Sequence, residues 1–190
     1  QPNSTDDAWL RSAFLTRSSF DFILSRVLNF CLIRTISPSK MSSKTDQEYM
    51  LQALELGESV KGTTGDNPWV GCLIVKDGKV LGQGATHPPG GLHAEAAALQ
   101  EAQKLKHSLD GATLYCTVEP CSFEGRTPSC AEAIARSGIT RVVSSIGDPH
   151  PKVNGEGFRI LHEAGIEVSV GTKAKRVEAS LKEWLDRYHS

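Results

Sequence analysis

The chain lacks several features that would place it in special classes of protein. No apolar run reaches the roughly 18 residues that cross a membrane, so we expect no membrane partner. The formal net charge is −1, without the basic excess of nucleic-acid-binding proteins, so we expect no nucleic-acid partner. Five cysteines are too few and too unevenly spaced for a disulfide framework. What remains is an ordinary globular chain of 190 residues, whose 39% hydrophobic content suffices for one full core.

Two short stretches concentrate the residues that bind metals and move protons. The first contains His93 and Glu95, and the second contains Cys121 and Cys130. A hydrolytic zinc site needs three protein ligands and one open position, and His93, Cys121 and Cys130 can supply the three. Glu95 follows the histidine too closely to be an easy fourth ligand, but it is well placed to handle the proton of a water molecule. We therefore expect Zn²⁺ as the cofactor and Glu95 as the catalytic acid–base.

The order of these residues is the layout of zinc deaminases, which carry His-x-Glu followed by Pro-Cys and a second cysteine. Cytidine and nucleic-acid deaminases usually have Pro-Cys-x-x-Cys, whereas nine positions separate Cys121 from Cys130, with Gly-Arg-Thr-Pro between them. That longer insert resembles the pyrimidine deaminase of riboflavin biosynthesis, within the cytidine-deaminase superfamily. The resemblance covers roughly residues 47–181. It includes Asn67-Pro-Trp-Val-Gly-Cys72, Gly111-Ala-Thr-Leu-Tyr115 and Asp148-Pro-His-Pro151.

The resemblance implies a reaction in which water replaces the 2-amino group of a 2,5-diaminopyrimidinone. The substrate of this family carries a sugar phosphate on its 6-amino group, as a ribityl chain in fungal relatives and a ribosyl ring in bacterial ones. Bacterial relatives often continue into a reductase, whereas this chain ends soon after its last predicted helix, like the stand-alone fungal type. We therefore expect 2,5-diamino-6-ribitylamino-4(3H)-pyrimidinone 5′-phosphate as the substrate of a homodimeric enzyme.

The resemblance also suggests residues that contact the substrate. Asn67 matches a residue that contacts the pyrimidine, and Arg126 matches a cation near the phosphate. Around the sugar and the phosphate the chain departs from the commoner family pattern: Thr86 replaces a histidine and is followed by His87, Phe123 replaces a histidine, and His150 replaces an asparagine. These departures leave the metal site intact. The expected substrate-binding residues are Asn67, His87, Arg126 and His150.

Three other functions stay open from the sequence. In the first alternative, the substrate is the ribosylamino form of the same compound. The second is a deaminase of another base or nucleoside, tRNA included, although that class fits Pro-Cys-x-x-Cys and, for RNA, a basic face. The third is a non-catalytic zinc-binding scaffold, which need not keep the carboxylate that Glu95 provides. A structural zinc site wants a fourth Cys or His, and only His87 and His150 stay open for that position.

The remaining pattern predicts an α/β fold. A capping box at Thr45 and Glu48 predicts a helix that ends near Lys61. The Asp77-Gly78 turn predicts a hairpin between two strands. Helices and strands then alternate, which predicts a three-layer α/β/α sandwich with a mixed five-stranded sheet, the cytidine-deaminase-like architecture. The expected elements are strands 70–75, 80–85, 113–118, 141–146 and 166–170, and helices 93–105, 157–164, 174–188 and one that starts at Thr127-Pro128.

Residues 1–44 do not fit the deaminase pattern. An amphipathic helix is predicted over residues 20–33, and scattered arginines resemble a transit peptide, but the acidic residues argue against one. We expect a non-catalytic extension over residues 1–44 and a deaminase domain over residues 45–190. Two thiols kept for a metal imply a reducing compartment. The expected location is the cytoplasm, or the mitochondrion if residues 1–44 are a leader.

Overall fold

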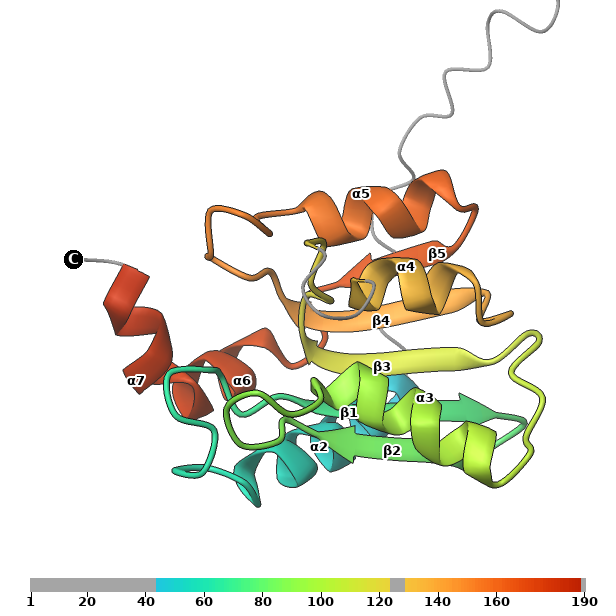
Figure 1. The fold of residues 1–190 in the computed structure, drawn as a ribbon, viewed down its shortest axis with the longest axis horizontal. Helices are drawn as coiled ribbons and strands as arrows, with labels where there is room; N and C mark the ends of the chain where they lie inside the picture. The colour runs from blue at the N-terminus through green and yellow to red at the C-terminus, as the bar shows by residue number, and fades with distance from the viewer. Residues whose placement is uncertain (1–43, 124–128, 189–190) are drawn as a thin grey trace, which may run out of the picture. The chain divides into compact units, whose positions relative to one another are not determined.

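A mixed sheet of five strands organises the part of the chain that the computed structural model describes, residues 44–123 and 129–188 (Figure 1). The strand order is β2-β1-β3-β4-β5. Strand β1 pairs antiparallel with β2 and β3, whereas β3, β4 and β5 run parallel. The bounds are Gly71–Lys76 for β1, Lys79–Ala85 for β2, Thr113–Val118 for β3, Arg141–Ile146 for β4 and Glu167–Val170 for β5. The predicted mixed five-stranded sheet is confirmed.

Helices cover both faces of this sheet, so the predicted three layers are confirmed (Figure 1). One face packs against α2 (Lys44–Glu58), whose Met50 and Ala53 contact Leu73 and Val75 of β1. The other face carries α3 (Ala94–Lys104), α4 (Cys130–Ala135) and α5 (Glu156–Glu163). After β5 the chain continues through α6 (Ala174–Ser180), α7 (Lys182–Leu185) and the 3₁₀-helix η2 (Asp186–Tyr188). None of the described helices is long and apolar enough to cross a membrane.

Small residues let α3 lie unusually close to β2. A Cβ atom on Gly84 would clash with the carbonyl oxygen of Ala94, and one on Gly82 would clash with that of Ala98. Ala94 and Ala98 are themselves fully buried. Because neither surface carries a bulky side chain, the N-terminal end of α3 is fixed against β2, and His93 is the N-cap residue of that helix.

Two further cysteines lie in the central strands of the sheet and are buried. Cys72 on β1 lies opposite Cys116 on β3, and both are free thiols without exposed surface.

Three of the predicted helices differ from the observed ones. Helix α2 already begins at Lys44, so Thr45 lies inside it, and it ends at Glu58, well before Lys61. Asp46 supplies the negative charge that the first turn favours. Helix α4 begins at Cys130 rather than at Thr127-Pro128. The hydroxyl of Ser129 caps it by accepting the Glu132 backbone N–H at 3.2 Å.

The third helix that differs is the C-terminal one, which was predicted as a single helix over residues 174–188. The helix breaks at Leu181, whose ψ of 10° departs from helical geometry. This change of direction keeps both Leu181 and Trp184 buried. The predicted helix over residues 20–33 and the predicted phosphate ligand Arg126 lie outside the described residues.

An ion-pair cluster holds α2 on the sheet, and its loss should destabilise the fold. Arg141 of β4 donates two hydrogen bonds to the Asp46 carboxylate, at 2.9 and 3.0 Å, and the Tyr115 hydroxyl donates a third at 2.8 Å. Asp46 and Tyr115 are buried, so Asp46→Ala leaves a largely buried guanidinium and hydroxyl without this partner. We expect the free energy of unfolding to fall by about 3 kcal/mol.

Urea denaturation would measure this loss. The control is Glu156→Ala, which breaks an exposed ion pair with Arg159 and should change stability far less. Equal stability losses in the two variants would contradict the importance of the Asp46 cluster.

Candidate zinc site

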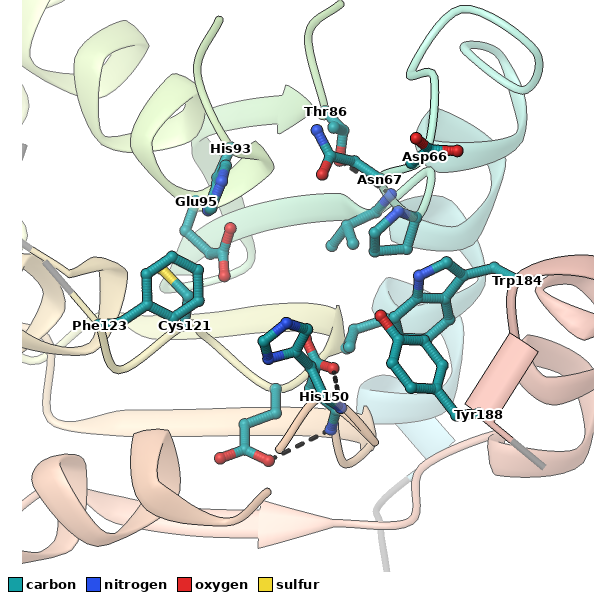
Figure 2. Close-up of a pocket in the computed structure, with 15 residues that line it drawn as sticks. Asp66, Asn67, Thr86, His93, Glu95, Cys121, Phe123, His150, Trp184 and Tyr188 are labelled. Atoms are coloured by element: carbon teal, nitrogen blue, oxygen red, sulfur yellow. Dashed lines mark hydrogen bonds between the residues drawn. The ribbon is translucent and has the colours of Figure 1, made fainter. Parts of the chain in front are cut away.

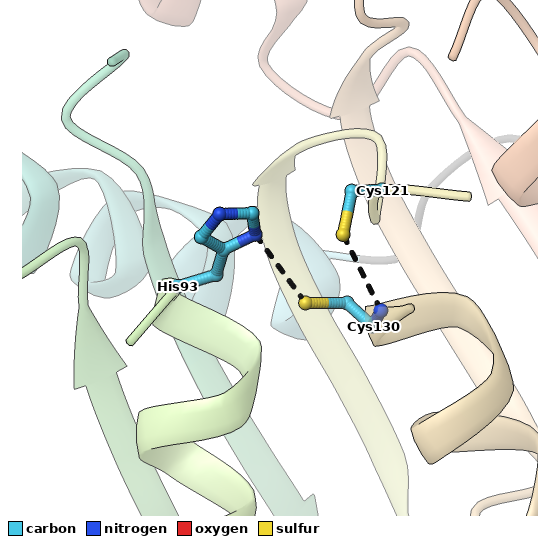
Figure 3. A group of neighbouring side chains, drawn as sticks. All are labelled: His93, Cys121 and Cys130. Atoms are coloured by element: carbon cyan, nitrogen blue, oxygen red, sulfur yellow. Dashed lines mark hydrogen bonds between the residues drawn. The ribbon is translucent and has the colours of Figure 1, made fainter. Parts of the chain in front are cut away.

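Three elements bring the predicted metal ligands together (Figure 3). His93 precedes α3, Cys121 follows β3 and Cys130 is the first residue of α4. One ligand atom from each lies within 4.8 Å of the others. Nδ1 of His93 is 3.6 Å from Sγ of Cys130, and the Cys130 backbone N–H donates a hydrogen bond to Sγ of Cys121 at 3.3 Å. The long insert between the cysteines therefore returns the chain to the same point.

The geometry and chemistry of these donors fit Zn²⁺. Tetrahedral zinc, with bonds of about 2.3 Å to sulfur and about 2.0–2.1 Å to nitrogen, places its donors about 3.5–3.8 Å apart. Within residues 44–123 and 129–188 no other group of three potential metal ligands converges, and neither His87 nor His150 joins this one. Three protein donors without a fourth are typical of catalytic rather than structural zinc sites.

The three donor groups differ in pKa. The hydrogen bond from Cys130 lowers the pKa of the Cys121 thiol to about 4, against the opposing effect of burial, and His93 stabilises the thiolate further. The same thiolate raises the pKa of His93 to about 9 through a hydrogen bond. The pKa of Cys130 is raised, because its thiol donates to Cys121 and because it is buried. A metal must therefore displace protons from His93 and Cys130 at neutral pH.

These pKa values predict that zinc binds more tightly as pH rises. Zinc needs a neutral imidazole and two thiolates, and the raised pKa values of His93 and Cys130 keep both groups protonated below neutrality. The apparent Kd for zinc should fall steadily from pH 6 to pH 8. Competition with a chromophoric chelator would measure it. A Kd that stays constant over this range would contradict the raised pKa values of His93 and Cys130.

Glu95 is the second residue of α3 and is almost fully buried beside the metal ligands (Figure 2). Burial raises the pKa of its carboxyl to about 7, and the negative charge of Cys121 adds to the effect. The Cys116 thiol and His93 act in the opposite direction. A carboxyl group with a pKa near neutrality can both accept and donate a proton, which suits general acid–base chemistry.

A second buried carboxylate organises the loops around the site. Glu119 accepts hydrogen bonds from the backbone N–H groups of Asp148 at 3.2 Å, Gly155 at 3.0 Å, Gly157 at 2.9 Å and Phe158 at 3.4 Å. It lies two residues before Cys121. Glu119 thus ties that cysteine to the loop after β4 and to the start of α5, which the sequence analysis missed.

The site opens into a pocket of about 180 Å³ (Figure 2). His93, Glu95 and Cys121 line one end of it. Of the four predicted substrate residues, Asn67 and His150 line the pocket. His87 is exposed and is not part of the lining, which includes the neighbouring Thr86 instead. The remaining residues of the lining are Asp66, Pro68, Val70, Val118, Glu119, Phe123, Asp148, Trp184 and Tyr188.

Two pocket residues come from the C-terminal helices and were missed by the sequence analysis. Trp184 and Tyr188 lie on α7 and η2, where the sequence pattern indicates only an amphipathic helix. Apolar periodicity cannot separate an aromatic residue of the core from one in a pocket wall. Only the break at Leu181 and the packing of α7 show their position.

Fold, metal ligands and buried carboxylate together define the class of protein. Residues 43–146, more than half of the chain, match the family model described as the cytidine and deoxycytidylate deaminase zinc-binding region. The chain belongs to this family, and with it to zinc-binding proteins.

Particular relatives point to riboflavin biosynthesis. The chain is 46% identical to the riboflavin biosynthesis protein RibD of Escherichia coli over 143 residues, which are 75% of this chain and 38% of RibD. It is 49% identical to RibD of Aquifex aeolicus over 132 residues, 69% of this chain and 36% of the relative. The chain thus spans less than half of the length of these relatives. The resemblance to riboflavin-pathway proteins predicted from the motifs is confirmed.

Solved structures give the same result. The diaminohydroxyphosphoribosylaminopyrimidine deaminase/5-amino-6-(5-phosphoribosylamino)uracil reductase of Thermotoga maritima superposes with a TM-score of 0.72 at 36% identity, covering 76% of this chain and 41% of that one. The Rib2 deaminase of Aspergillus oryzae in complex with DARIPP gives a TM-score of 0.54 at 21% identity, covering 75% and 98%. At that identity the second comparison shows the shared fold alone.

Proposed function

We propose that this chain is a zinc-dependent deaminase of riboflavin biosynthesis. Its reaction replaces the 2-amino group of a phosphorylated 2,5-diaminopyrimidinone with oxygen and releases ammonia. One observation carries the proposal: two donors of the three-donor metal cluster, His93 and Cys121, line the same pocket as a buried carboxyl with a pKa of about 7. The RibD relatives supply the pathway.

Each residue of the site is assigned a role in the reaction. When held by His93, Cys121 and Cys130, Zn²⁺ supplies Lewis acidity that favours the loss of a proton from water. Glu95 accepts the proton of the attacking water and passes it to the adjacent ring nitrogen of the pyrimidine. It then delivers the second proton of the water to the departing amino group. Water and the amine thus become a carbonyl group and ammonia, and Glu95 returns to its starting charge.

Substrate contacts are proposed at three positions. Asn67 and His150 line the pocket and offer an amide and an imidazole to the pyrimidine and its sugar. Because no lysine or arginine lines the described part of the pocket, we assign the phosphate to Arg126, in the segment between the two cysteines. A contact from the exposed His87 stays a prediction.

The form of the sugar is the finer part of the proposal. The altered residues Phe123 and His150 at the pocket favour the ribitylamino compound expected from the sequence. Similarity favours the ribosylamino compound, because the Thermotoga protein whose name contains phosphoribosylamino is 36% identical, against 21% for the Rib2 deaminase. Similarity along the whole domain outweighs two residues at the rim. We therefore rank the ribosylamino 5′-phosphate first and the ribitylamino 5′-phosphate second.

The test is to measure ammonia release by zinc-loaded protein from both phosphorylated compounds and from their dephosphorylated forms. We expect turnover of both phosphorylated compounds, a higher kcat/KM for the ribosylamino form, and a large rise in KM without the phosphate. A higher kcat/KM for the ribitylamino form would reverse the ranking. Undiminished activity without the phosphate would remove the role of Arg126. No ammonia from any of the four compounds would refute the proposed function.

Residues 1–44 are proposed to be dispensable for the chemistry. Every residue assigned to the metal, the proton transfer or the pocket lies after Lys61. A chain that starts at Thr45 is expected to bind zinc and to keep its kcat/KM, because it retains every one of these residues. Loss of turnover in a folded, zinc-loaded truncation would show that the extension contributes to the site.

The oligomeric state and the location are proposals as well. We propose a homodimer, which sedimentation velocity would test against a monomer. We also propose the cytoplasm, because a site with two thiol ligands needs a reducing compartment. The mitochondrial alternative stays a prediction.

A further inference from the structure

Four aromatic rings form a continuous row along one wall of the pocket. The ring of Phe123 lies 6.2 Å from that of His150, centroid to centroid, and His150 lies 6.2 Å from Tyr188. Tyr188 meets Trp184 edge-on at 5.4 Å. All four residues line the pocket. The row therefore links the loop that carries Cys121 to the C-terminal helices.

The row begins at the metal end of the pocket and leads away from it. Figure 2 shows Phe123 beside Cys121 and Glu95, Tyr188 and Trp184 at the opposite side, and His150 between them. The carbon that loses its amino group must lie near Glu95. In the expected substrate the sugar is attached to the 6-amino group, away from the reacting 2-amino group. With the 2-amino group at the metal end of the pocket, the sugar would extend toward Tyr188.

The outer rings are unusually accessible for aromatic side chains. Phe123 is 43% exposed and Tyr188 is 37% exposed, whereas Trp184 is only 2% exposed. Trp184 is thus the anchor of the row in the core, and the other two rings present faces that a ligand can cover. Aromatic rings with a polar edge suit ligands that carry both C–H and O–H groups, as sugars do.

The hydrogen bonds of His150 show which polar group it offers. The Lys152 backbone N–H donates to Nδ1 of His150 at 3.2 Å, so Nδ1 is an acceptor and Nε2 carries the ring hydrogen. The loop is held by Asp148, whose Oδ1 accepts the His150 backbone N–H at 2.8 Å, and by Glu119 behind it. His150 therefore presents a fixed N–H donor in the middle of the row.

Tyr188 is held in place from two sides. Its ring packs on the buried Trp184, and the preceding residue, Arg187, donates to the Asp66 carboxylate at 3.1 Å and to the Asp66 carbonyl oxygen at 3.3 Å. Asp66 also lines the pocket. These contacts keep η2 at the pocket. Tyr188 itself lies well beyond residues 43–146, the part that matches the zinc-binding family model.

We propose that Tyr188, with His150 and Phe123, recognises the sugar on the pyrimidine and is a specificity-determining residue outside the zinc-binding region. The inference rests on the proposed function and names the part of the substrate that the row binds. The sugar's C–H groups pack on the rings of Phe123 and Tyr188, and its hydroxyl groups accept from Nε2 of His150 and bond to the Tyr188 hydroxyl. Specificity for a sugar-bearing pyrimidine then depends on the C-terminal helices rather than on the zinc ligands.

The test compares two substrates in one protein preparation, the phosphorylated sugar-bearing aminopyrimidine and the bare triaminopyrimidinone without a sugar. The ratio of their kcat/KM values cancels any loss of folded protein. Tyr188→Ala should lower this ratio roughly tenfold, as a rise in KM for the sugar-bearing compound with little change in kcat. Tyr188→Phe should lower it less, since the ring remains. Where turnover of the bare compound is too slow to measure, its inhibition constant replaces kcat/KM.

Two further variants complete the design. Phe123→Ala should reduce the ratio as Tyr188→Ala does, which guards against a folding defect in the C-terminal helices. Leu105→Ala removes another exposed apolar side chain, at the end of α3 and outside the pocket, and should leave the ratio unchanged. Active wild-type protein with unchanged ratios in Tyr188→Ala and Phe123→Ala would overturn this inference alone. Wild-type protein inactive on both pyrimidines would overturn the proposed function on which it rests.

Discussion

Glu95→Gln is expected to lower kcat by about 10²–10⁴-fold while the protein keeps its fold and its zinc. Glutamine has nearly the shape of glutamate but cannot accept the proton of the attacking water. Glu95 is buried beside the metal ligands, and its carboxyl has a pKa of about 7. The large effect follows because one carboxyl serves every proton transfer in the cycle.

The measurement is single-turnover ammonia release, with the zinc content determined on the same sample. Glu132→Gln is the matched control, because it makes the same chemical change on α4, next to the metal site but outside the pocket. Its kcat should equal that of the wild type. Near-normal kcat in a zinc-loaded Glu95→Gln protein would rule out the role proposed for Glu95.

The double variant Cys121→Ala/Cys130→Ala is expected to lose both zinc and activity. Two of the three donors disappear, and a lone imidazole does not retain Zn²⁺ against dilution. Loss of Cys121 also removes the thiolate that raises the pKa of His93, so the remaining donor changes as well. We expect zinc to fall from one atom per chain to near zero, and kcat to fall below detection.

Elemental analysis after gel filtration would measure the zinc content. Cys72→Ala is the control, since Cys72 is a buried thiol that is not part of the metal cluster, and this variant should retain zinc. The assignment of the metal ligands fails if the double variant binds zinc as fully as the control does.

The convergence of His93, Cys121 and Cys130 was predictable from sequence because metal binding constrains both residue type and spacing. His93 and Glu95 are separated by one residue at a helix start, so they stay close along the chain in any fold that forms this helix. The strand before Cys121 and the helix at Cys130 are each indicated by the apolar pattern, so the sequence also suggests where these two cysteines lie. The order of strands and helices followed from the same periodicity and from the Asp77-Gly78 turn.

Helix boundaries and the pocket wall were not predictable, because they depend on tertiary contacts. Glu119 reaches backbone amides 29 to 39 positions later in the chain, and no local pattern signals that. Several polar residues compete to cap each helix, and no local pattern singled out Ser129, whose hydroxyl caps α4. Tyr188 enters the pocket only because the last helix breaks at Leu181.

The central claim is a hydrolytic deamination, and the origin of the product's oxygen tests it most directly. Zinc-loaded protein would convert the phosphorylated 2,5-diaminopyrimidinone in water enriched with heavy oxygen, and mass spectrometry would follow the product. The account predicts one heavy oxygen at the former 2-amino position, one ammonia per product molecule, and loss of both signals after chelation of zinc. An unchanged pyrimidine, or a product formed equally well without zinc, would contradict it.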